Sequence, residues 1–472
     1  MPNLTPIVGA IADDFTGATD LATMLVTRGF RTEVTVGPPE PAPVADPVTD
    51  ARPVTDDPGV ADDRGVDAIV VALKSRTAPV ATAVEDSVAA LRALRAAGCE
   101  RFYFKYCSTF DSTPHGNIGP VIDALLDELG ERRTVVAPSF PATGRTVYRS
   151  RLFVHDELLS ESPMRDHPLT PMRDSHLERL LAPQTRRPVH ALPHETVRAG
   201  SAAVAGALAG PELQDGLIVT DATTDDDLRT LAAATASLPL VTGAAGLALG
   251  LTGPRPDAAS ARAGAADAIP SARGAVLSGS ASAATRAQVA HAREHLPHRK
   301  LDLAALRADF GAAVGALTAF VTDCWEADPT TPPLVYAVAD AADVERAAPG
   351  PDARGTADTA SALVERALAR LATELVGAGA TGLLVAGGET SGAVTTALGV
   401  RTLRMGAPLA PGVSWATARA RGVPGAGAGS GADSGLGADP GSGVGAREID
   451  LALKSGNFGA VDLFTSAWKA LV

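Results

Sequence analysis

Short apolar runs that alternate with helical patterns recur along this chain, and this alternation limits its fold more than any other feature. In the first half, the runs Ile7–Ala12, Ala68–Leu73 and Phe102–Tyr106 each read as a buried strand. Helical patterns over Ala18–Arg28 and Val80–Ala96 separate them. Wholly apolar strands joined by helices are typical of a parallel sheet that is covered on both faces. We therefore expect an α/β fold.

The alternation stops and then restarts, which predicts two tandem α/β domains with largely parallel sheets. A stretch rich in Ala, Pro and Asp interrupts it, so we place an N-terminal domain at 1–251, a linker at 252–273 and a C-terminal domain at 274–472. Two large domains also suit a chain of 472 residues. In the second series we expect strands at Ala275–Leu277, near Phe320, Val335 and Leu383, and at Ile449–Leu453, with helices at Ala283–His295 and Ala357–Val376. We expect the active site in an inter-domain cleft, at the carboxyl ends of strands.

The composition excludes several classes of protein. A formal net charge of −13 repels a polyanion and disfavours nucleic acid as a partner. Charges interrupt every apolar stretch before it reaches the ~18 positions that a membrane span needs. The start of the chain has no charged leader followed by an apolar segment, and three cysteines cannot form a disulfide framework. We therefore expect a soluble cytoplasmic protein without a membrane partner, and the sequence leaves a homo-oligomer open.

Two segments differ in composition from the rest of the chain. Pro38–Gly65 is dominated by Pro, Asp, Val and Ala, and Gly422–Gly445 consists almost entirely of Gly, Ala, Ser and Asp. Neither contains enough apolar surface to order itself by burial. We expect both to be mobile insertions, and the sequence assigns them no role.

The first candidate site follows the first predicted strand, where Asp13 and Asp14 precede Phe15, Thr16 and Gly17. Carboxylates at a strand-to-helix turn can hold a substrate hydroxyl, accept its proton or position magnesium. Capping of the helix by Asp14 or Thr16 is the simpler alternative. The two aspartates are adjacent, so the spacing does not match the Asp-x-Asp-x-Thr of aspartyl-nucleophile phosphohydrolases.

Cations and hydroxyls follow the next two predicted strands. Lys74, Ser75 and Arg76 form a candidate clamp for a carboxylate, with a solvated turn as the alternative of nearly equal weight. Lys105 and Asp111 lie in an aromatic-rich segment, in which we assign Phe102 and Phe104 mainly to packing. These polar groups converge at one edge if the sheet is parallel.

A third strand end adds to the same predicted edge. The loop Pro138–Thr146 supplies hydroxyls and Arg145. The following segment, Ser160–His176, contains three prolines that prevent a continuous helix, so it reads as a structured loop that covers the site.

The second half contains three loops suited to phosphate. Glycines after a strand let backbone amides approach phosphate oxygens, and a helix N-terminus favours an anion. The residues concerned are Ser278 and Ser280, then Gly387, Gly388, Glu389 and Thr390, and finally Lys454 and Gly456. Two such loops joined by a third indicate a nucleotide site. The chain has neither a P-loop motif nor a Gly-x-Gly-x-x-Gly motif at Gly387, which excludes a P-loop enzyme and weakens a nicotinamide interpretation.

Other catalytic patterns receive little support. His291, His295 and His298 have metal-like spacing, but no glutamate follows His291, and a solvated helix end explains them better. Serine-hydrolase chemistry lacks a Gly-x-Ser-x-Gly motif. Metal ligands cannot be assigned from these residues.

Taken together, the motifs resemble those of the four-carbon acid sugar kinases. The segments that carry the resemblance are IADDFTGATDLA, LKSRT, YFKYCSTFDST with GNIGPV, APSFPATGRTVY, RDHPLTPM, LSGSASAATRAQV, GGETSG and LALKSGNFG. They occur in the family's order from Ile11 to Gly459. The aromatic-rich segment and the Ser160–His176 segment look like the 3-oxo-tetronate 4-kinase branch.

This resemblance implies a small-molecule kinase with an N-terminal acid-sugar domain, a C-terminal ATP domain, and ATP and Mg²⁺ as cofactors. The implied reaction phosphorylates the C4 hydroxyl of a four-carbon acid sugar, with 3-oxo-tetronate as the first choice of substrate. D-threonate or D-erythronate kinase activity, or a non-catalytic acid-sugar-binding protein, remain the alternatives.

The resemblance also assigns residues to the two ligands. Substrate contacts fall on Asp13 or Asp14, on Lys74, Ser75 and Arg76, and on Lys105 and Asp111, whereas ATP contacts fall on Ser280, on Gly387, Gly388, Glu389 and Thr390, and on Gly456. We expect Lys74 and Arg76 to bind the substrate carboxylate, Asp14 or else Asp13 to accept the proton, and Lys454 to stabilise the phosphoryl charge.

Overall fold

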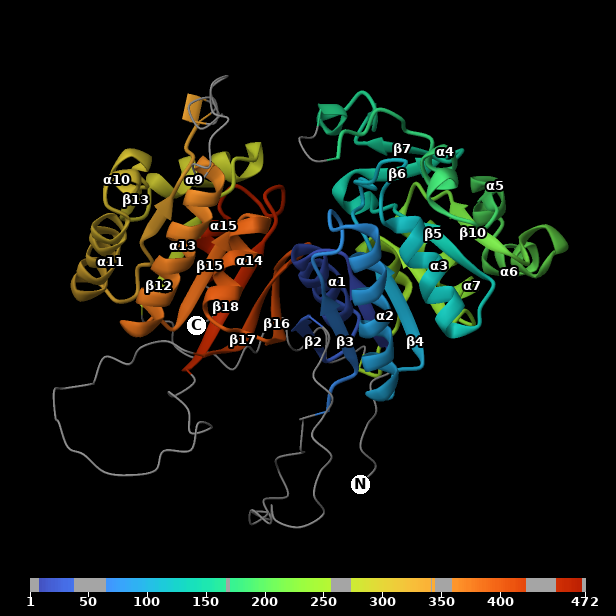
Figure 1. Cartoon of the computed structure of the whole chain (residues 1–472), viewed down its shortest axis with the longest axis horizontal. Coiled ribbons are helices and arrows are strands. Elements are labelled where there is room, and N and C mark those ends of the chain that lie inside the picture. Colours follow the sequence, from blue (N-terminus) through green and yellow to red (C-terminus); the bar gives the residue numbers. More distant parts are fainter. Residues whose placement is uncertain are drawn as a thin grey trace, which may run out of the picture. The chain divides into compact units, whose positions relative to one another are not determined.

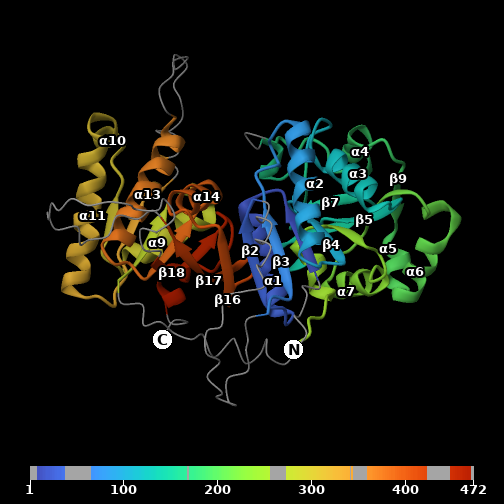
Figure 2. The same ribbon diagram turned by 60° about the horizontal axis from the view of Figure 1, so that its bottom comes forward.

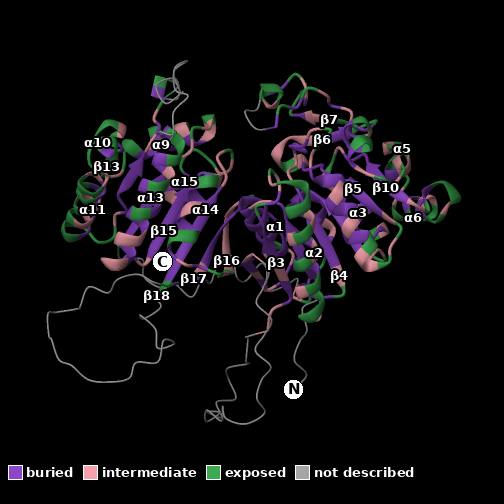
Figure 3. Cartoon of the chain, in the orientation of Figure 1, coloured by how far each residue is buried: buried purple, intermediate pink, exposed green. Residues whose placement is uncertain are grey.

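The computed structural model describes residues 8–37, 65–166, 170–255, 273–340, 342–343, 359–421 and 447–468. Backbone contacts divide the chain into two compact units, Met1–Asp257 and Ala258–Val472. Both are α/β domains with buried strands, as the alternation predicted (Figures 1, 2 and 3). The predicted insertions Pro38–Gly65 and Gly422–Gly445 lie almost wholly outside the described residues, as does most of the linker predicted at 252–273.

The main sheet of unit 1 is parallel and has the strand order β2-β3-β1-β4-β11-β5-β10-β9. Its strands are β1 Val8–Ala12, β2 Thr32–Val36, β3 Ala68–Ala72, β4 Arg101–Lys105, β5 Arg133–Ala137, β9 Val189–Leu192, β10 Gly216–Thr220 and β11 Leu240–Gly243. The chain leaves β1 toward β2 on one side and later places β4 on the other. The carboxyl end of β1 is therefore a switch point, where ligands bind in open α/β sheets.

Helices cover the sheet of unit 1. Helix α1 packs on η5, which also contacts α7, whereas α2 packs on α3. Right-handed crossovers in opposite directions place these two groups on opposite faces. The bounds are α1 Phe15–Thr27, α2 Val80–Ala96, α3 Ile118–Leu129, α4 Leu177–Leu181, α5 His194–Arg198, α6 Ser201–Ala209, α7 Asp225–Ala234 and η5 Ala245–Gly250. A small antiparallel sheet follows β5 and contains β6 Arg145–Tyr148, β7 Arg151–Val154 and β8 Glu157–Leu158.

Phe102 and Phe104 are buried in the core of unit 1, as predicted. Phe104, Tyr106 and Phe110 are buried and meet edge to face, with ring centroids 5.6 and 5.7 Å apart. Such contacts fix the backbone that leaves β4.

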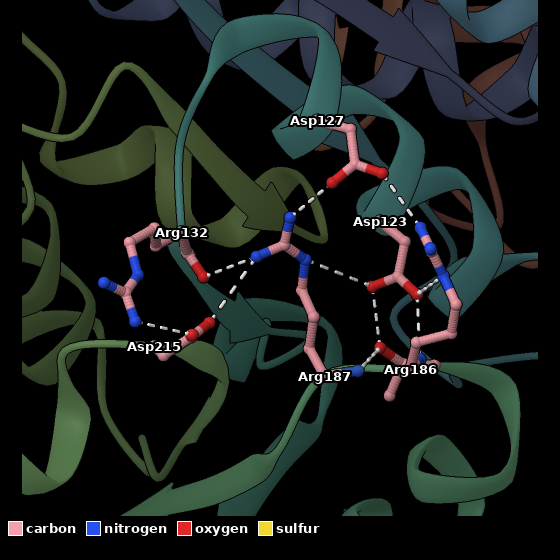
Figure 4. A network of polar contacts seen from close by, with 7 residues as sticks. Asp123, Asp127, Arg132, Arg186, Arg187 and Asp215 are labelled. Atoms are coloured by element: carbon pink, nitrogen blue, oxygen red, sulfur yellow. Dashed lines mark hydrogen bonds and ion pairs between the residues drawn. The ribbon is translucent and has the colours of Figure 1, made fainter.

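The amino-terminal edge of this sheet carries a network of ion pairs (Figure 4). We call it the amino-edge network; it consists of Asp123, Asp127, Arg132, Arg186, Arg187 and Asp215. Arg187 Nη2 lies 2.6 Å from Asp127 Oδ1, and its Nη1 lies 3.5 Å from Asp215 Oδ1. Because Arg132 precedes β5 and Arg187 precedes β9, the network ties the starts of these strands to helix α3.

The sheet of unit 2 has the order β13-β14-β12-β15-β18-β17-β16. Strands β13, β14, β12, β15 and β18 pair in parallel, whereas β17 pairs antiparallel with both β18 and β16. Their bounds are β12 Gly274–Ser278, β13 His298–Lys300, β14 Leu334–Tyr336, β15 Gly382–Ala386, β16 Thr402–Ala410, β17 Val413–Ala420 and β18 Arg447–Lys454. The helices are α9 Ala283–Arg293, α10 Leu303–Ala308, α11 Phe310–Ala327, α13 Ala360–Gly377, α14 Gly388–Ala397 and α15 Leu463–Ser466.

One predicted strand in unit 2 is wrong. The segment around Phe320 lies inside helix α11, Phe310–Ala327. Its buried residues, Val314, Leu317, Val321 and Trp325, recur every three or four positions, which is helical spacing. The strands predicted at Ala275–Leu277, Val335, Leu383 and Ile449–Leu453 are confirmed as parts of β12, β14, β15 and β18. Within the described residues, no helix is long and apolar enough to span a membrane.

Candidate active site

At the carboxyl edge of unit 1, the loops after β1 and β3 meet through an arginine. Arg76 Nε donates to Asp13 Oδ2 at 2.9 Å and its Nη2 donates to Asp13 Oδ1 at 2.8 Å. The same Nη2 lies 2.9 Å from Asp14 Oδ1. The backbone amides of Ser75 and Arg76 both donate to the carbonyl of Asp13. Since β1 and β3 are neighbours in parallel register, the sheet brings the two loops together.

A third carboxylate reaches the same guanidinium from the loop after β4. Asp111 Oδ2 lies 3.7 Å from Arg76 Nη1. Phe110 and Asp111 adopt φ angles of 64° and 35°, a left-handed turn that redirects the chain. Thr109 Oγ1 donates to Asp111 Oδ1 at 2.7 Å and fixes the carboxylate. We call Asp13, Asp14, Arg76 and Asp111 the carboxyl-edge cluster.

Asp14 has two functions in this geometry. Its Oδ1 caps helix α1 by accepting a hydrogen bond from Gly17 N at 2.7 Å. A Cβ atom on Gly17 would lie 2.4 Å from that oxygen, so the cap requires glycine. No residue in the described part of the chain donates a hydrogen bond to Asp14 Oδ2, and the side chain is 30% exposed. Helix capping therefore occupies one oxygen of Asp14 and leaves the other available to a ligand.

Asp13 differs from Asp14 because both its oxygens bind Arg76 and its side chain is buried. Burial raises the pKa of Asp13, while the adjacent Arg76 acts to lower it. A carboxylate held in this way is better suited to positioning the arginine than to accepting a proton.

Lys105 lies beside the cluster, deep under helix α1. Its Nζ donates to the carbonyl of Tyr106 at 3.1 Å and lies 3.8 Å from Asp20 Oδ2. Burial raises the pKa of Asp20 to about 6, and Lys105 opposes this rise. Asp20 Oδ1 is buried without a hydrogen-bond partner. Asp20 was not among the predicted site residues, because in the sequence it is a single acid within a helical pattern.

The two remaining predicted residues of this edge, Ser75 and Lys74, differ in burial. Ser75 is buried, and its Oγ has no hydrogen-bond partner. Asn117 Nδ2 holds the loop by donating to the carbonyls of Ser75 and Ala78 at 2.7 and 2.8 Å, a role that the sequence did not indicate. Lys74 is exposed and forms no ion pair with any residue that the structure describes. The structure therefore does not bring Lys74 into the cluster.

In unit 2, the loops after β12, β15 and β18 lie side by side because these strands are neighbours. The amides of Gly279 and Ser280 donate to the carbonyl of Ala386 at 3.0 and 3.2 Å. The amide of Gly387 donates to the carbonyl of Lys454 at 2.9 Å. The three loops that the sequence singled out thus converge at one edge of the unit.

Glycines let these loops approach closely. A Cβ atom on Gly279 would lie 2.2 Å from Thr390 Oγ1, and one on Gly456 would lie 2.8 Å from Ser280 Oγ. Gly387 has a φ of 125°, which side chains rarely allow, and directly precedes helix α14.

Three further residues complete this predicted set. Ser278 is buried, and its Oγ has no partner. Gly388 and Glu389 begin helix α14; Gly388 is half-buried and Glu389 is exposed. The amides of this first turn have no partner within the helix and favour an anion.

Lys454 is fully buried beneath these loops. Its Nζ donates to Thr285 Oγ1 at 2.8 Å and to the carbonyl of Gly456 at 3.1 Å. Burial lowers the pKa of Lys454 to about 7. No acidic side chain pairs with it among the described residues. Thr285, which also donates to Gly456 O at 2.7 Å, is a site residue that the sequence did not reveal.

The described residues contain no group of three His, Cys, Asp or Glu side chains that could hold a metal ion. His291 and His295 stack with ring centroids 4.4 Å apart, and the exposed His295 Nδ1 lies 2.8 Å from the carbonyl of His291. Magnesium in kinases is held largely by phosphate oxygens and water with one or two carboxylates, so it does not require such a cluster.

Two family models match the chain, in line with this division of chemistry. A sugar-binding N-terminal domain matches residues 8–251, and a nucleotide-binding C-terminal domain matches residues 275–464. The chain is 45% identical to a 3-oxo-tetronate kinase of Burkholderia multivorans over 99% of this chain and 97% of the relative. It is 44% identical to a 3-oxo-tetronate kinase of Cupriavidus necator, again over 99% and 97%.

Two solved structures are similar over the same length. One is a Salmonella typhimurium LT2 protein described as a putative tRNA synthase, with a TM-score of 0.77, 37% identity and 98% coverage of both chains. Another is a Haemophilus influenzae protein, with a TM-score of 0.72, 36% identity and coverage of 98% of this chain and 100% of that one. The two family models and the full-length relatives agree with the two sets of loops described above, one in each unit. The chain belongs to the four-carbon acid sugar kinase family.

Proposed function

We propose that this chain transfers the γ-phosphoryl group of ATP to the C4 hydroxyl of 3-oxo-tetronate. Its full-length similarity to proteins named 3-oxo-tetronate kinase supports this proposal. The observation that carries it is the glycine-lined edge of unit 2, in which Lys454 is a buried amine that meets no acidic side chain in the described part of the chain. A cytoplasmic location and the oligomeric state stay predictions.

The edge of unit 2 suits the phosphates of a nucleotide. Gly279, Gly387 and Gly456 let the three loops pack closely, and the start of α14 offers free amides. Lys454 has no acidic partner among the described residues, and a phosphate group would supply the missing negative charge. The hydroxyl of Ser278 lacks a hydrogen-bond partner. A buried amine without an acidic partner and a buried hydroxyl without a hydrogen-bond partner, both judged among the described residues, fit an anionic ligand.

Magnesium would neutralise phosphate charge during the transfer. Glu389, exposed in the first turn of α14, is the acidic residue that we assign to it on this edge.

The edge of unit 1 suits the sugar hydroxyl. Gly17 N and Arg76 fix Asp14 Oδ1, which leaves Asp14 Oδ2 free to accept a proton. As the C4 oxygen bonds to the γ-phosphorus and the bond from that phosphorus to ADP breaks, Asp14 takes the hydroxyl proton. Arg76 and Asp13 hold Asp14 in place. Asp13 is the second choice of base because both its oxygens bind Arg76.

The remaining predicted substrate contacts fit this arrangement to different degrees. Ser75, Lys105 and Asp111 lie at or beside the carboxyl-edge cluster. Lys74 is exposed, and its assignment to the substrate carboxylate stays a prediction.

Release of ADP from ATP, measured with purified protein and each of 3-oxo-tetronate, D-threonate and D-erythronate, tests this function. We expect the highest kcat/KM with 3-oxo-tetronate. A higher kcat/KM with D-threonate or D-erythronate would change the assigned substrate but not the assigned reaction. Binding of the acids without any ADP release would contradict a kinase.

A further inference from the structure

The proposed reaction needs a cation for the substrate carboxylate, and Arg76 is poorly placed to supply it alone. Its guanidinium already meets Asp13, Asp14 and Asp111. Five guanidinium donors shared among three carboxylates leave little capacity for a fourth. A new anion at Arg76 would also meet the repulsion of the three aspartates.

Arg145 is a second cation near this edge, and it forms no ion pair with any residue that the structure describes. It opens β6, and its backbone exchanges hydrogen bonds with Phe140, at the end of the loop that leaves β5. Its Nη1 donates to the carbonyl of Thr143. Its Nε is buried and has no hydrogen-bond partner, and no described carboxylate lies within ion-pair distance of the side chain. Arginine stays charged in proteins, so this is a half-buried cation with a buried Nε and no counter-ion among the described residues.

Arg145 belongs to the same electrostatic environment as the cluster. Burial lowers the pKa of Arg145, whereas Cys107, Asp111 and Asp20 act to raise it. Asp111 is also the carboxylate that approaches Arg76 Nη1. The charge of Asp111 therefore acts on both guanidinium groups. Arg76 already pairs with carboxylates, whereas Arg145 pairs with none among the described residues.

Two further buried polar atoms have no hydrogen-bond partner among the described residues. They are Ser139 Oγ, in the loop that follows β5, and Asp20 Oδ1, whose charge acts on Arg145. Buried polar groups in folded proteins are nearly always paired with protein, water or a ligand. An arginine Nε, a hydroxyl and a carboxylate oxygen without partners at the carboxyl edge of a parallel sheet point to a polar ligand.

We infer that Arg145 binds the carboxylate of the acid sugar, through its Nε and a terminal nitrogen, and so selects acids over neutral sugars. This inference rests on the proposed function. A planar guanidinium matches a carboxylate with two parallel hydrogen bonds. The C1 carboxylate and the C4 hydroxyl are opposite ends of the substrate, so separate groups serve them: Arg145 holds the acid end, and Asp14 receives the proton at the other.

The test replaces Arg145 with a neutral side chain of related shape. In Arg145→Gln we expect the KM for 3-oxo-tetronate to rise ~10- to 100-fold, the loss typical of a hydrogen-bonded charge. The KM for ATP should stay within about twofold of the wild-type value. The decisive readout is the ratio of kcat/KM for the acid to that for the neutral ketotetrose in which a hydroxymethyl group replaces the carboxylate. Loss of the carboxylate contact should reduce this preference by a similar factor, whereas general damage to the fold would lower both values together.

Two variants complete the experiment. Arg151→Gln, on the neighbouring strand β7, removes an exposed arginine and should leave both KM values and the preference unchanged. Arg145→Lys keeps the charge without the bidentate geometry and should retain the preference for acid with an intermediate KM. If Arg145→Gln does not fold, Arg145→Lys decides, and an unchanged KM in it overturns the inference.

The outcomes separate the inference from the function. An active wild-type enzyme with an unchanged acid preference in Arg145→Gln overturns the role of Arg145 but not the kinase. If wild-type protein shows no turnover, the kinase proposal fails; calorimetric binding of 3-oxo-tetronate to wild type and Arg145→Gln then decides the role of Arg145 by itself, and equal affinities overturn it.

Discussion

Unit 1 contains two arginine–aspartate networks at opposite edges of one sheet, and they differ in how charge is balanced. In the amino-edge network, three arginines face three aspartates, and two of these aspartates, Asp127 and Asp215, have side chains 52% and 39% exposed. In the carboxyl-edge cluster, Arg76 faces three aspartates, and the side chains of Asp13 and Asp111 are 6% and 9% exposed. The same chemical groups thus form a solvated, balanced network in one place and a buried, unbalanced one in the other.

This difference teaches how to tell a structural ion-pair network from a reactive one. Exposed ion pairs with balanced charge contribute little to the free energy of folding. Here they mainly tie strand starts to a helix. A buried excess of carboxylate raises pKa values, as it does for Asp13, and is costly unless it serves a ligand. Only the second kind lies at the strand ends where parallel sheets bind substrates.

The largest effect is expected from Asp14→Asn. Asparagine keeps a cap oxygen for helix α1 but cannot accept the substrate proton, so kcat should fall about 1,000-fold or more. Binding of ATP, measured by calorimetry, should change less than about threefold. A variant that retains a tenth of wild-type turnover would show that the free oxygen of Asp14 is not the base.

Next in size is the loss of Arg76. Arg76→Gln leaves the buried Asp13 and Asp111 and the partly exposed Asp14 without their cation, and we expect a loss of about 3 to 5 kcal/mol in the free energy of unfolding together with loss of turnover. Urea unfolding followed by circular dichroism measures it. A loss below about 1 kcal/mol would make the carboxyl-edge cluster equivalent to the exposed network.

Lys454 in unit 2 extends the comparison to a buried amine that has no acidic side chain as a partner among the described residues. Its folded-state pKa of about 7 lies below the usual 10.5, so the unfolded chain binds the proton more tightly and stability rises with pH between these values. Lys454→Met should therefore raise the free energy of unfolding of the nucleotide-free protein at pH 7 by a few kcal/mol, at most about 4. It should also flatten the dependence on pH and weaken ATP binding. Reduced stability at pH 7 would contradict this assignment.

The smallest effect should come from the amino-edge network. Arg187→Gln removes its central cation, but Arg132 and Arg186 still neutralise the partly exposed aspartates. We expect a loss of about 0.5 to 1 kcal/mol in unfolding free energy, smaller in 1 M salt, and unchanged turnover. A large loss of activity here would remove the distinction between the two networks.

The sequence predicted the α/β class and which loops carry polar groups, because both depend on local patterns. It could not predict that Arg76 meets Asp13, Asp14 and Asp111, since that contact depends on the strand order β3-β1-β4, which the chain order does not reveal.

The errors also have physical causes. Helix α11 was taken for a strand near Phe320 because its alanines and glycines hide the helical spacing of Val314 and Leu317. The β16–β17 hairpin was not predicted at all, because β16 is only partly buried and lacks a continuous apolar run. Asp20 and Thr285 have no sequence signal beyond residue type, and only packing shows their contacts.

Hydrogen–deuterium exchange of the protein with and without 3-oxo-tetronate, in the absence of ATP, tests the central claim most directly. The account predicts slower amide exchange in segments 13–20, 73–78 and 105–117, which form or adjoin the carboxyl-edge cluster, and in segment 139–148, which contains Arg145. It predicts no change in segments 123–132 and 185–189 of the amino-edge network. Protection confined to the amino edge, or its absence from the carboxyl edge at saturating acid, would contradict the account.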